Sequence, residues 1–174
     1  MLFVHATGAR IGEALAVIWS EIDQDADITS TIIRVKGKGL IRTRTKSRAG
    51  QRVLLLPTWA IALLRRRFEA GVDADDPVFP DVLGGYRDPS NTRRSLRNAR
   101  GGDALAWVTS HNLRKTVATI LDEAGLSARI AADQLGHARI SMTQDVYFAR
   151  NVVDPRAAGA LESALTDRSG EKDG

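Results

Sequence analysis

The sequence predicts an α+β fold that is mostly α-helical, with a small three-stranded antiparallel sheet near its N-terminal side. Apolar residues recur at helical spacing in the first twenty residues and again through most of the chain after residue 57. Between these regions lie short β-like runs separated by glycine-bearing turns. The three expected strands are Ser30 to Val35, Leu40 to Thr45 and Arg52 to Leu56.

The expected helices follow from apolar spacing and from capping residues. The first helix begins at Gly8 or Ala9, after an apolar lead-in at residues 1 to 6 that is typical of the end of a preceding helix. Another helix follows Pro57, with arginines near its end. The remaining helices are expected at Ser90 to Ala99, His111 to Ala124, Ser127 to Leu135, Ser141 to Phe148 and Asp154 to Leu165.

The length and composition predict one intracellular domain. A chain of 174 residues suffices for one sizeable core and is short for two, so we expect residues 1–166 to form one domain and residues 167–174 a polar, flexible tail. The sequence holds no cysteine, which excludes disulfides and thiolate metal sites. Its longest apolar runs are far short of a membrane span. We therefore expect a soluble, cytoplasmic protein.

Positive charge is distributed unevenly along the chain. The formal net charge is only +4, but no acidic residue occurs from Ile28 to Phe68, where lysines and arginines are frequent. A second basic cluster extends from Arg87 to Arg100. A single basic run would be interpreted as a solvent-exposed face of the protein. Two runs in one small domain favour a polyanionic partner, and nucleic acid is the leading candidate.

Two further segments carry residues that could do chemistry. In SHNLRKTVATILDEAG, His111 and Arg114 share a face at the start of a helix, where a phosphate could bind. In LGHARISMTQDVYF, Gly136 ends a helix, His137 follows it, and Tyr147 comes ten residues later. Taken alone, these residues are better explained as surface groups, a helix-end histidine and a core aromatic.

The order of the motifs changes that interpretation. TGARIGEAL, TKSRAGQRVLLLP, HNLR, LGH and a terminal VY occur in one order over almost the whole chain, from Ala6 to about Leu165. Together they resemble the catalytic domain of the tyrosine recombinase (phage integrase) family. The resemblance implies site-specific DNA recombination and integration by strand cleavage and rejoining. It implies a tyrosine recombinase-like fold for the predicted helices and sheet.

The resemblance also implies a role for each motif residue. Arg10 and Arg114 match the two catalytic arginines, and Glu13 matches the acidic residue that supports the first. His111 and His137 match the two histidine positions. Lys46 matches the mobile hairpin lysine. The alternative interpretation is that Lys46 is a solvated cation on a DNA-facing hairpin. The catalytic set is Arg10, Lys46, His111, Arg114, His137 and Tyr147.

These roles define an expected reaction that requires no metal and no other cofactor. Tyr147 attacks a DNA phosphodiester and forms a 3′-phosphotyrosyl bond, while Lys46 protonates the departing 5′ oxygen. Arg10 and Arg114 stabilise the charge that develops on the phosphate oxygens. His137 supplies a hydrogen bond, and His111 assists proton transfer around the phenol.

The expected partner is double-stranded DNA, bound by a homo-oligomer that the resemblance implies is a tetrameric synapse. The chain has no room for the core-binding domain of the family, so we expect a truncated catalytic domain with weak DNA affinity. Two alternatives stay open: a non-catalytic DNA-binding relic and a relaxing activity like that of type IB topoisomerases. The arginines expected to contact DNA outside the catalytic set are Arg42, Arg44, Arg48, Arg93, Arg94 and Arg97.

Overall fold

The computed structural model describes residues 1–68, 71–101, 103–139, 141 and 143. Within these ranges, short 3-10 helices lie at η1 (Trp19–Glu21), η2 (Arg48–Gly50) and η3 (Asp103–Leu105). The strands are β1 (Asp25–Ile28), β2 (Ser30–Val35), β3 (Gly39–Arg44) and β4 (Arg52–Leu55). The α-helices are α1 (Leu2–Thr7), α2 (Ile11–Ala14), α3 (Thr58–Arg67), α4 (Pro89–Ala99), α5 (Ser110–Glu123) and α6 (Ala128–Leu135).

The β structure differs from the predicted three-stranded sheet, although the α+β class is confirmed. Two separate two-stranded antiparallel sheets are present in the described part of the chain. β2 pairs with β3, with Ile33 opposite Ile41, whereas β4 pairs with β1, with Leu54 opposite Ala26. The expected third strand therefore pairs with a strand that the sequence reading missed. β1 was missed because Asp25 and Asp27 alternate with its two buried residues, and aspartate is depleted in strands.

The main apolar core joins the N-terminal helices to the sheets and to α3. Val4, Val17 and Ile28 are each at most 2% exposed, as are Leu64 and Val78. A smaller cluster of Val117, Ala118 and Leu135 packs α5 on α6. Burial of these side chains supplies most of the driving force that brings the segments together.

Glycine at position 8 permits α1 to end against α5 and α6. Gly8 has a φ of 69°, and a Cβ there would lie 2.7 Å from Leu135 Cδ2 and 3.2 Å from Val117 Cγ1. A larger residue would strain the backbone and push these helices apart. Gly8 therefore places the start of the TGARIGE motif directly against the middle of α5 and the end of α6.

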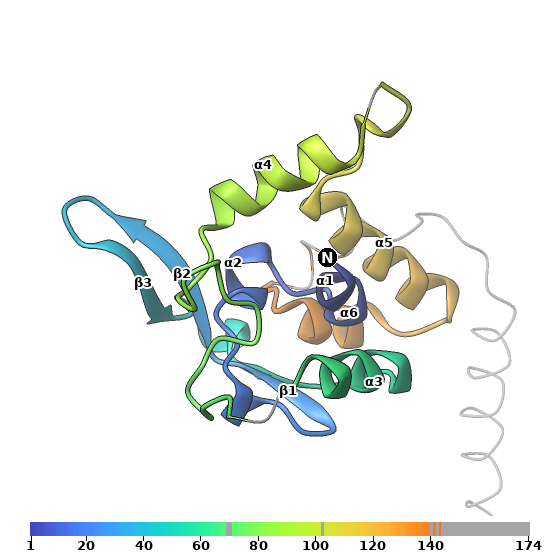
Figure 1. Cartoon of the computed structure of the whole chain (residues 1–174). Coiled ribbons are helices and arrows are strands. Elements are labelled where there is room, and N and C mark those ends of the chain that lie inside the picture. The colour runs from blue at the N-terminus through green and yellow to red at the C-terminus, as the bar shows by residue number, and fades with distance from the viewer. Residues whose placement is uncertain (69–70, 102, 140, 142, 144–174) are drawn as a thin grey trace, which may run out of the picture.

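The elements surround α2 on three sides (Figure 1). The β2–β3 hairpin extends away from the helical body, α4 lies across the top of the view, and α5 and α6 lie on the opposite side from the hairpin. An ion pair between Arg34 on β2 and Asp88, the N-cap of α4, ties the hairpin to α4. No helix within the described ranges is both long and apolar enough to cross a membrane.

Capping residues define the ends of α5 and α6 as the sequence predicts. Thr109 Oγ1 accepts the Asn112 N–H at 3.1 Å, and Ser127 Oγ accepts the Ile130 N–H at 3.3 Å. Gly136 ends α6 in the left-handed conformation. The helix expected at Ser141 to Phe148 lies outside the described residues except for Ser141 and Thr143. The helix expected at Asp154 to Leu165 and the tail at 167–174 lie wholly outside them.

Candidate active site

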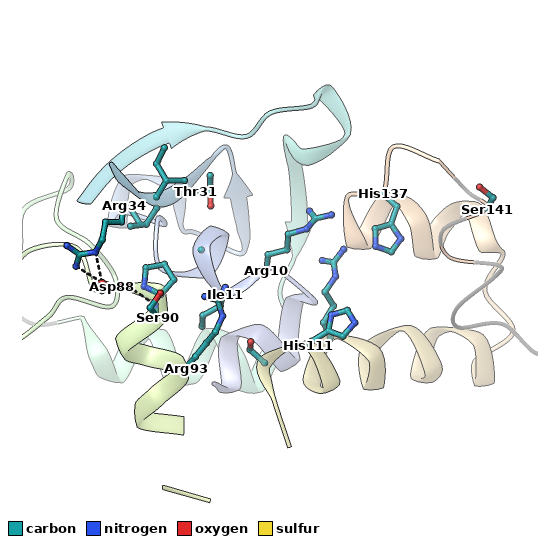
Figure 2. Close-up of a pocket in the computed structure, with 16 residues that line it drawn as sticks. Arg10, Ile11, Thr31, Arg34, Asp88, Ser90, Arg93, His111, His137 and Ser141 are labelled. Carbon is teal, nitrogen blue, oxygen red and sulfur yellow. Dashed lines mark hydrogen bonds and ion pairs between the residues drawn. The ribbon is translucent and has the colours of Figure 1, made fainter. Parts of the chain in front are cut away.

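A groove of about 930 Å³ lies where α2, the β2–β3 hairpin and the first turns of α4 and α5 meet the segment that follows α6. In Figure 2, Arg10 lies between Arg34 and Asp88 at one end of the groove and His137 at the other. Arginines and histidines outnumber the single aspartate in this lining, so the groove suits an anionic ligand. The arginines and histidines that line it are Arg10, Arg34, Arg93, His111, Arg114 and His137.

Arg10 stands at the N-cap of α2 with its side chain 46% exposed. Its Nη1 donates to Glu13 Oε1 at 2.7 Å, and its backbone N–H donates to Glu13 Oε2 at 3.0 Å. A glutamate three residues after the N-cap commonly reaches back in this way, because the first amides of a helix lack intrahelical partners. The carboxylate thus orients the guanidinium while one side of Arg10 remains open to the groove.

Glu13 is buried and shared between two arginines. Only 3% of the residue is exposed, and Arg52 Nη2 donates to its Oε2 at 3.0 Å. Burial raises the pKa of the Glu13 carboxyl, but the charges and hydrogen bonds of Arg52 and Arg10 lower it by more, so its pKa lies below the ordinary value. Glu13 is therefore an anion at neutral pH, and its role beside Arg10 agrees with the sequence prediction.

Arg114 differs from the sequence prediction in its exposure. The sequence indicated an exposed arginine beside His111, whereas Arg114 is only 4% exposed. Its Nη1 donates to the carbonyl of Gly8 and its Nη2 to the carbonyl of Leu135. Those carbonyls end α1 and α6, where backbone acceptors lack partners within the helix. Arg114 therefore lines the groove and also holds two helix ends together.

His111 occupies the first turn of α5, directly after Ser110. The side chain is exposed, and both residues line the groove. The positive end of the helix dipole is located here. The structure thus places His111 and Arg114 on one side of α5, as their spacing predicts.

His137 follows the left-handed Gly136 and is 8% exposed. Its Nδ1 lies 2.9 Å from Oγ1 of Thr143, which is fully buried. Burial is the main cause that lowers the pKa of His137 to about 4, and the charges of Arg114 and Arg10 lower it further. The imidazole is therefore neutral at pH 7, so it can act as a hydrogen-bond partner but not as a cation.

The low pKa of His137 predicts a specific dependence of stability on pH. An unfolded chain binds this proton near pH 6.5, whereas the folded chain binds it only near pH 4, so acid favours the unfolded state in that interval. The contribution of His137 to the free energy of unfolding therefore has its full value above pH 6.5 and decreases as the pH falls toward 4. The decrease caused by His137 is at most about 3 kcal/mol. Urea titrations at pH 5 and pH 7 measure this difference.

The variant His137→Gln should reduce the difference in the free energy of unfolding between pH 5 and pH 7. Lys38→Gln, in the exposed turn between β2 and β3, is the surface control and should retain it. An unchanged difference in the free energy of unfolding for His137→Gln would contradict the assignment.

Lys46 is not among the residues that line the groove. It is exposed between β3 and η2, as are Arg44 and Arg48 on either side of it. The structure therefore brings Arg10, His111, Arg114 and His137 together but leaves Lys46 apart from them. Among the described residues, the predicted hairpin around Lys46 is not formed, because β3 pairs with β2 and β4 pairs with β1. Of the arginines predicted to contact DNA, Arg93 lines the groove, and Arg94 and Arg97 are exposed on α4.

Arg42 was predicted to contact DNA, but its guanidinium binds groups within the protein. Its Nε donates to the Ala16 carbonyl at 2.8 Å, and its Nη2 donates to Glu21 Oε1 at 2.5 Å. The side chain is only 24% exposed. It points inward because the Ala16 carbonyl, just after α2, and the Glu21 carboxylate, at the end of η1, both require donors. Arg42 thus holds the hairpin to the body of the domain.

Tyr147 lies outside the described residues, so its role as nucleophile stays a prediction. Within the described ranges, no group of three or more histidine, aspartate or glutamate side chains is arranged to hold a metal ion.

Arg52 is the site residue that sequence reasoning missed. Its side chain is 8% exposed, contacts Glu13 and does not line the groove. The sequence shows it only as one more arginine in a basic run, at the start of an apolar strand. Its distinguishing partners are 39 and 82 residues away, and no local pattern reveals them.

Arginines and histidines gathered in one groove of an α+β domain have the chemistry to bind phosphate oxygens. The chain belongs to the phage integrase family, whose family model matches residues 1–152. This match confirms the resemblance seen in the sequence motifs.

Two relatives show how much of a longer protein this chain represents. A XerC-like tyrosine recombinase of Caldanaerobacter subterraneus subsp. tengcongensis is 27% identical over 186 residues, which cover 93% of this chain and 47% of the relative. Tyrosine recombinase XerC of Mesorhizobium japonicum is 32% identical over 145 residues, which cover 83% of this chain and 44% of the relative. The chain thus spans less than half the length of these two relatives.

Solved structures share the fold. The Tn1549 transposon integrase in complex with transposon right end DNA matches with a TM-score of 0.68 at 18% identity, over 95% of this chain and 57% of that one. The XerA recombinase matches with a TM-score of 0.58 at 23% identity, over 95% and 55%. At these identities the likeness establishes the architecture of the catalytic-domain fold and leaves the chemistry to the residues.

Proposed function

We propose that this domain catalyses site-specific DNA recombination by breaking and rejoining DNA strands through a 3′-phosphotyrosyl intermediate. The observation that carries the proposal is the convergence of four groups on one groove. Arg10 comes from the start of α2, His111 and Arg114 from α5, and His137 from the turn after α6. Family membership supports the same reaction.

The two arginines would stabilise the transition state. Attack on a phosphodiester increases the negative charge on its non-bridging oxygens, and a guanidinium offers a planar fork that matches two such oxygens. Arg10 is half exposed and held by a buried carboxylate, so it is positioned before DNA arrives. Arg114 is held by two backbone carbonyls. This preorganisation reduces the cost of orienting both charges.

The remaining groups would transfer protons. The oxygen of Tyr147 forms a bond to phosphorus, the bond from phosphorus to the 5′ oxygen breaks, and that oxygen takes a proton from Lys46. The phenolic proton passes to His111 or through it to water. Neutral His137 donates a hydrogen bond to the phosphate. Because Lys46 lies apart from the groove lining, its segment must approach the phosphate when DNA binds.

Rejoining would follow the same path in reverse. A 5′-hydroxyl from a partner strand attacks the phosphotyrosyl ester, and Tyr147 leaves. The ester retains the energy of the broken bond, so the exchange requires no nucleotide cofactor.

The proposed partner is double-stranded DNA. We propose that the protein binds it in the cytoplasm as a homo-oligomer, in a tetrameric synapse. The Tn1549 integrase structure is a complex with transposon DNA, which supports DNA binding for this fold. Arg44, Arg48, Arg93, Arg94 and Arg97 are the cations proposed to contact its backbone.

A nicked suicide substrate tests the proposal. Cleavage near the nick releases a short oligonucleotide, so the 5′-hydroxyl is lost and the covalent adduct accumulates. The native chain should form an adduct that survives denaturation, and Tyr147→Phe should form none. Absence of an adduct with the native chain would favour a non-catalytic DNA-binding relic, and an adduct with Tyr147→Phe would assign the nucleophile elsewhere. Relaxation of a supercoiled plasmid without sequence preference would instead support the topoisomerase alternative.

A further inference from the structure

Arg52 does not line the groove, but it connects three segments of the site. It is the first residue of β4, and its side chain is 8% exposed. Nε donates to the Gln134 carbonyl at 2.9 Å, Nη1 to the Gly50 carbonyl at 2.9 Å, and Nη2 to Glu13 Oε2 at 3.0 Å. All three nitrogens of the guanidinium are therefore engaged, each with a different part of the chain.

Each of those partners is close in the chain to a group proposed for the chemistry. Glu13 orients Arg10. Gln134 lies three residues before His137, at the end of α6. Gly50 ends η2, and its N–H is accepted by Ser47 Oγ at 3.2 Å, next to Lys46. One side chain thus contacts the supports of the arginine, the histidine and Lys46.

Close packing at Gly136 leaves Arg52 little freedom. A Cβ on Gly136 would lie 2.5 Å from Arg52 Nη1 and 2.9 Å from the Ala49 carbonyl, and Gly136 has a φ of 66°. The turn that presents His137 therefore rests directly on the guanidinium and on η2. A shift of Arg52 would move this turn or the segment that holds Lys46.

Arg52 also determines how Arg10 binds its carboxylate. Glu13 Oε2 already accepts from Arg52 Nη2 and from the Arg10 backbone, so Arg10 Nη1 binds the other oxygen, Oε1. Without Arg52, the buried carboxylate would have Arg10 as its remaining cation and would attract the whole fork of Arg10 inward. The shared carboxylate therefore keeps Arg10 directed toward the groove.

We infer that Arg52 is a positioning residue that holds Arg10, His137 and the Lys46 segment in the arrangement required for strand cleavage. This inference rests on the proposed function. Arginine is required at this position because a planar fork can donate to three acceptors in different directions, whereas a lysine ammonium at the end of a flexible stem cannot reproduce that geometry.

Arg42 offers a matched control for a purely structural role. It also joins a glutamate and a backbone carbonyl, through Glu21 and Ala16, and it is likewise largely buried. It does not line the groove, and its partners are not the supports of the proposed catalytic groups. Replacing Arg42 by lysine should lower the melting temperature but leave the cleavage rate unchanged below that temperature.

The test compares Arg52→Lys with Arg42→Lys in the full chain on two nicked suicide DNAs. One DNA is normal, and the other carries sulfur in place of the bridging 5′ oxygen at the cleavage site. A thiolate leaves without protonation, so the second DNA does not require Lys46 as an acid. Rates of adduct formation are measured in single turnovers below both melting temperatures.

Arg52→Lys should form the adduct about 10²-fold more slowly than the native chain on normal DNA, since a small misplacement of several catalytic groups has an effect of this size. The sulfur-containing DNA should recover part of that loss, because one of the misplaced groups is the acid. Arg42→Lys should match the native chain on both DNAs.

Two results would overturn the inference. If Arg52→Lys and Arg42→Lys lose melting temperature alike and both cleave at the native rate, Arg52 is structural only. If the loss for Arg52→Lys is equal on the two DNAs, Arg52 does not position the Lys46 segment. Arg52→Gln, which keeps an amide donor, replaces Arg52→Lys if the lysine variant does not fold. Failure of the native chain to form any adduct is a separate result, which removes the proposed function and this inference together.

Discussion

Arg10→Ala should slow formation of the phosphotyrosyl adduct by about 10³-fold or more, the scale on which a single arginine stabilises phosphoryl transfer. The reason is the loss of a guanidinium that Glu13 holds at the groove before DNA binds. Substrate binding should change much less, because the many other cations of the domain still contact the DNA backbone. Single-turnover cleavage of a suicide DNA at saturating protein separates the chemical step from binding.

The same substitution should change stability little. The Arg10 side chain is 46% exposed, and an exposed ion pair contributes about 1 kcal/mol or less. Glu13 retains Arg52 and the Arg10 backbone N–H as partners. Arg10→Lys is the matched control: it keeps the charge but loses the fork, so its rate should fall between those of the native chain and the alanine variant. A native cleavage rate for Arg10→Ala would show that another residue occupies this role.

Arg114→Ala should abolish cleavage and also destabilise the fold. Its side chain is buried and donates to the carbonyls of Gly8 and Leu135, which lie on segments far apart in the sequence. Removing it leaves two buried acceptors without these donors, at a cost of about 3 kcal/mol or more in the free energy of unfolding. For a chain of this size that corresponds to a fall of roughly 10 °C in the melting temperature.

The contrast between the two arginines is the informative result. Arg10→Ala should melt close to the native temperature, whereas Arg114→Ala should melt well below it, and circular dichroism measures both. His111→Gln, an exposed change on the same helix as Arg114, should leave the melting temperature unchanged. Equal melting temperatures for Arg114→Ala and the native chain would mean that its two carbonyl contacts contribute nothing to the fold.

Helices α5 and α6 were predictable because their ends depend on local chemistry, whereas the helix expected from Gly8 or Ala9 is only the short α2, Ile11–Ala14. Thr109 and Ser127 cap α5 and α6 through hydrogen bonds to residues only three positions away, and Gly136 ends α6 in a conformation that glycine adopts readily. His111 and Arg114 therefore lie near the start of α5 and His137 directly after α6, although the burial of Arg114 was not predicted. The pairing of β4 with β1 was not predictable in the same way, because it joins residues about thirty positions apart and β1 carries two aspartates.

The sequence by itself determined the family and the α+β class, and it proposed which arginines and histidines meet a phosphate. Spacing and motif order suffice for these conclusions because each motif depends on residues a few positions apart and the order of the motifs is read directly along the chain. Only the tertiary structure decided which cations face the groove and which face inward. In the same basic run, Arg42 and Arg52 bind buried or partly buried carboxylates while Arg44, Lys46 and Arg48 are exposed. The reason is physical: a guanidinium turns inward where distant segments leave an acceptor without a donor, and those acceptors exist only once the chain has folded.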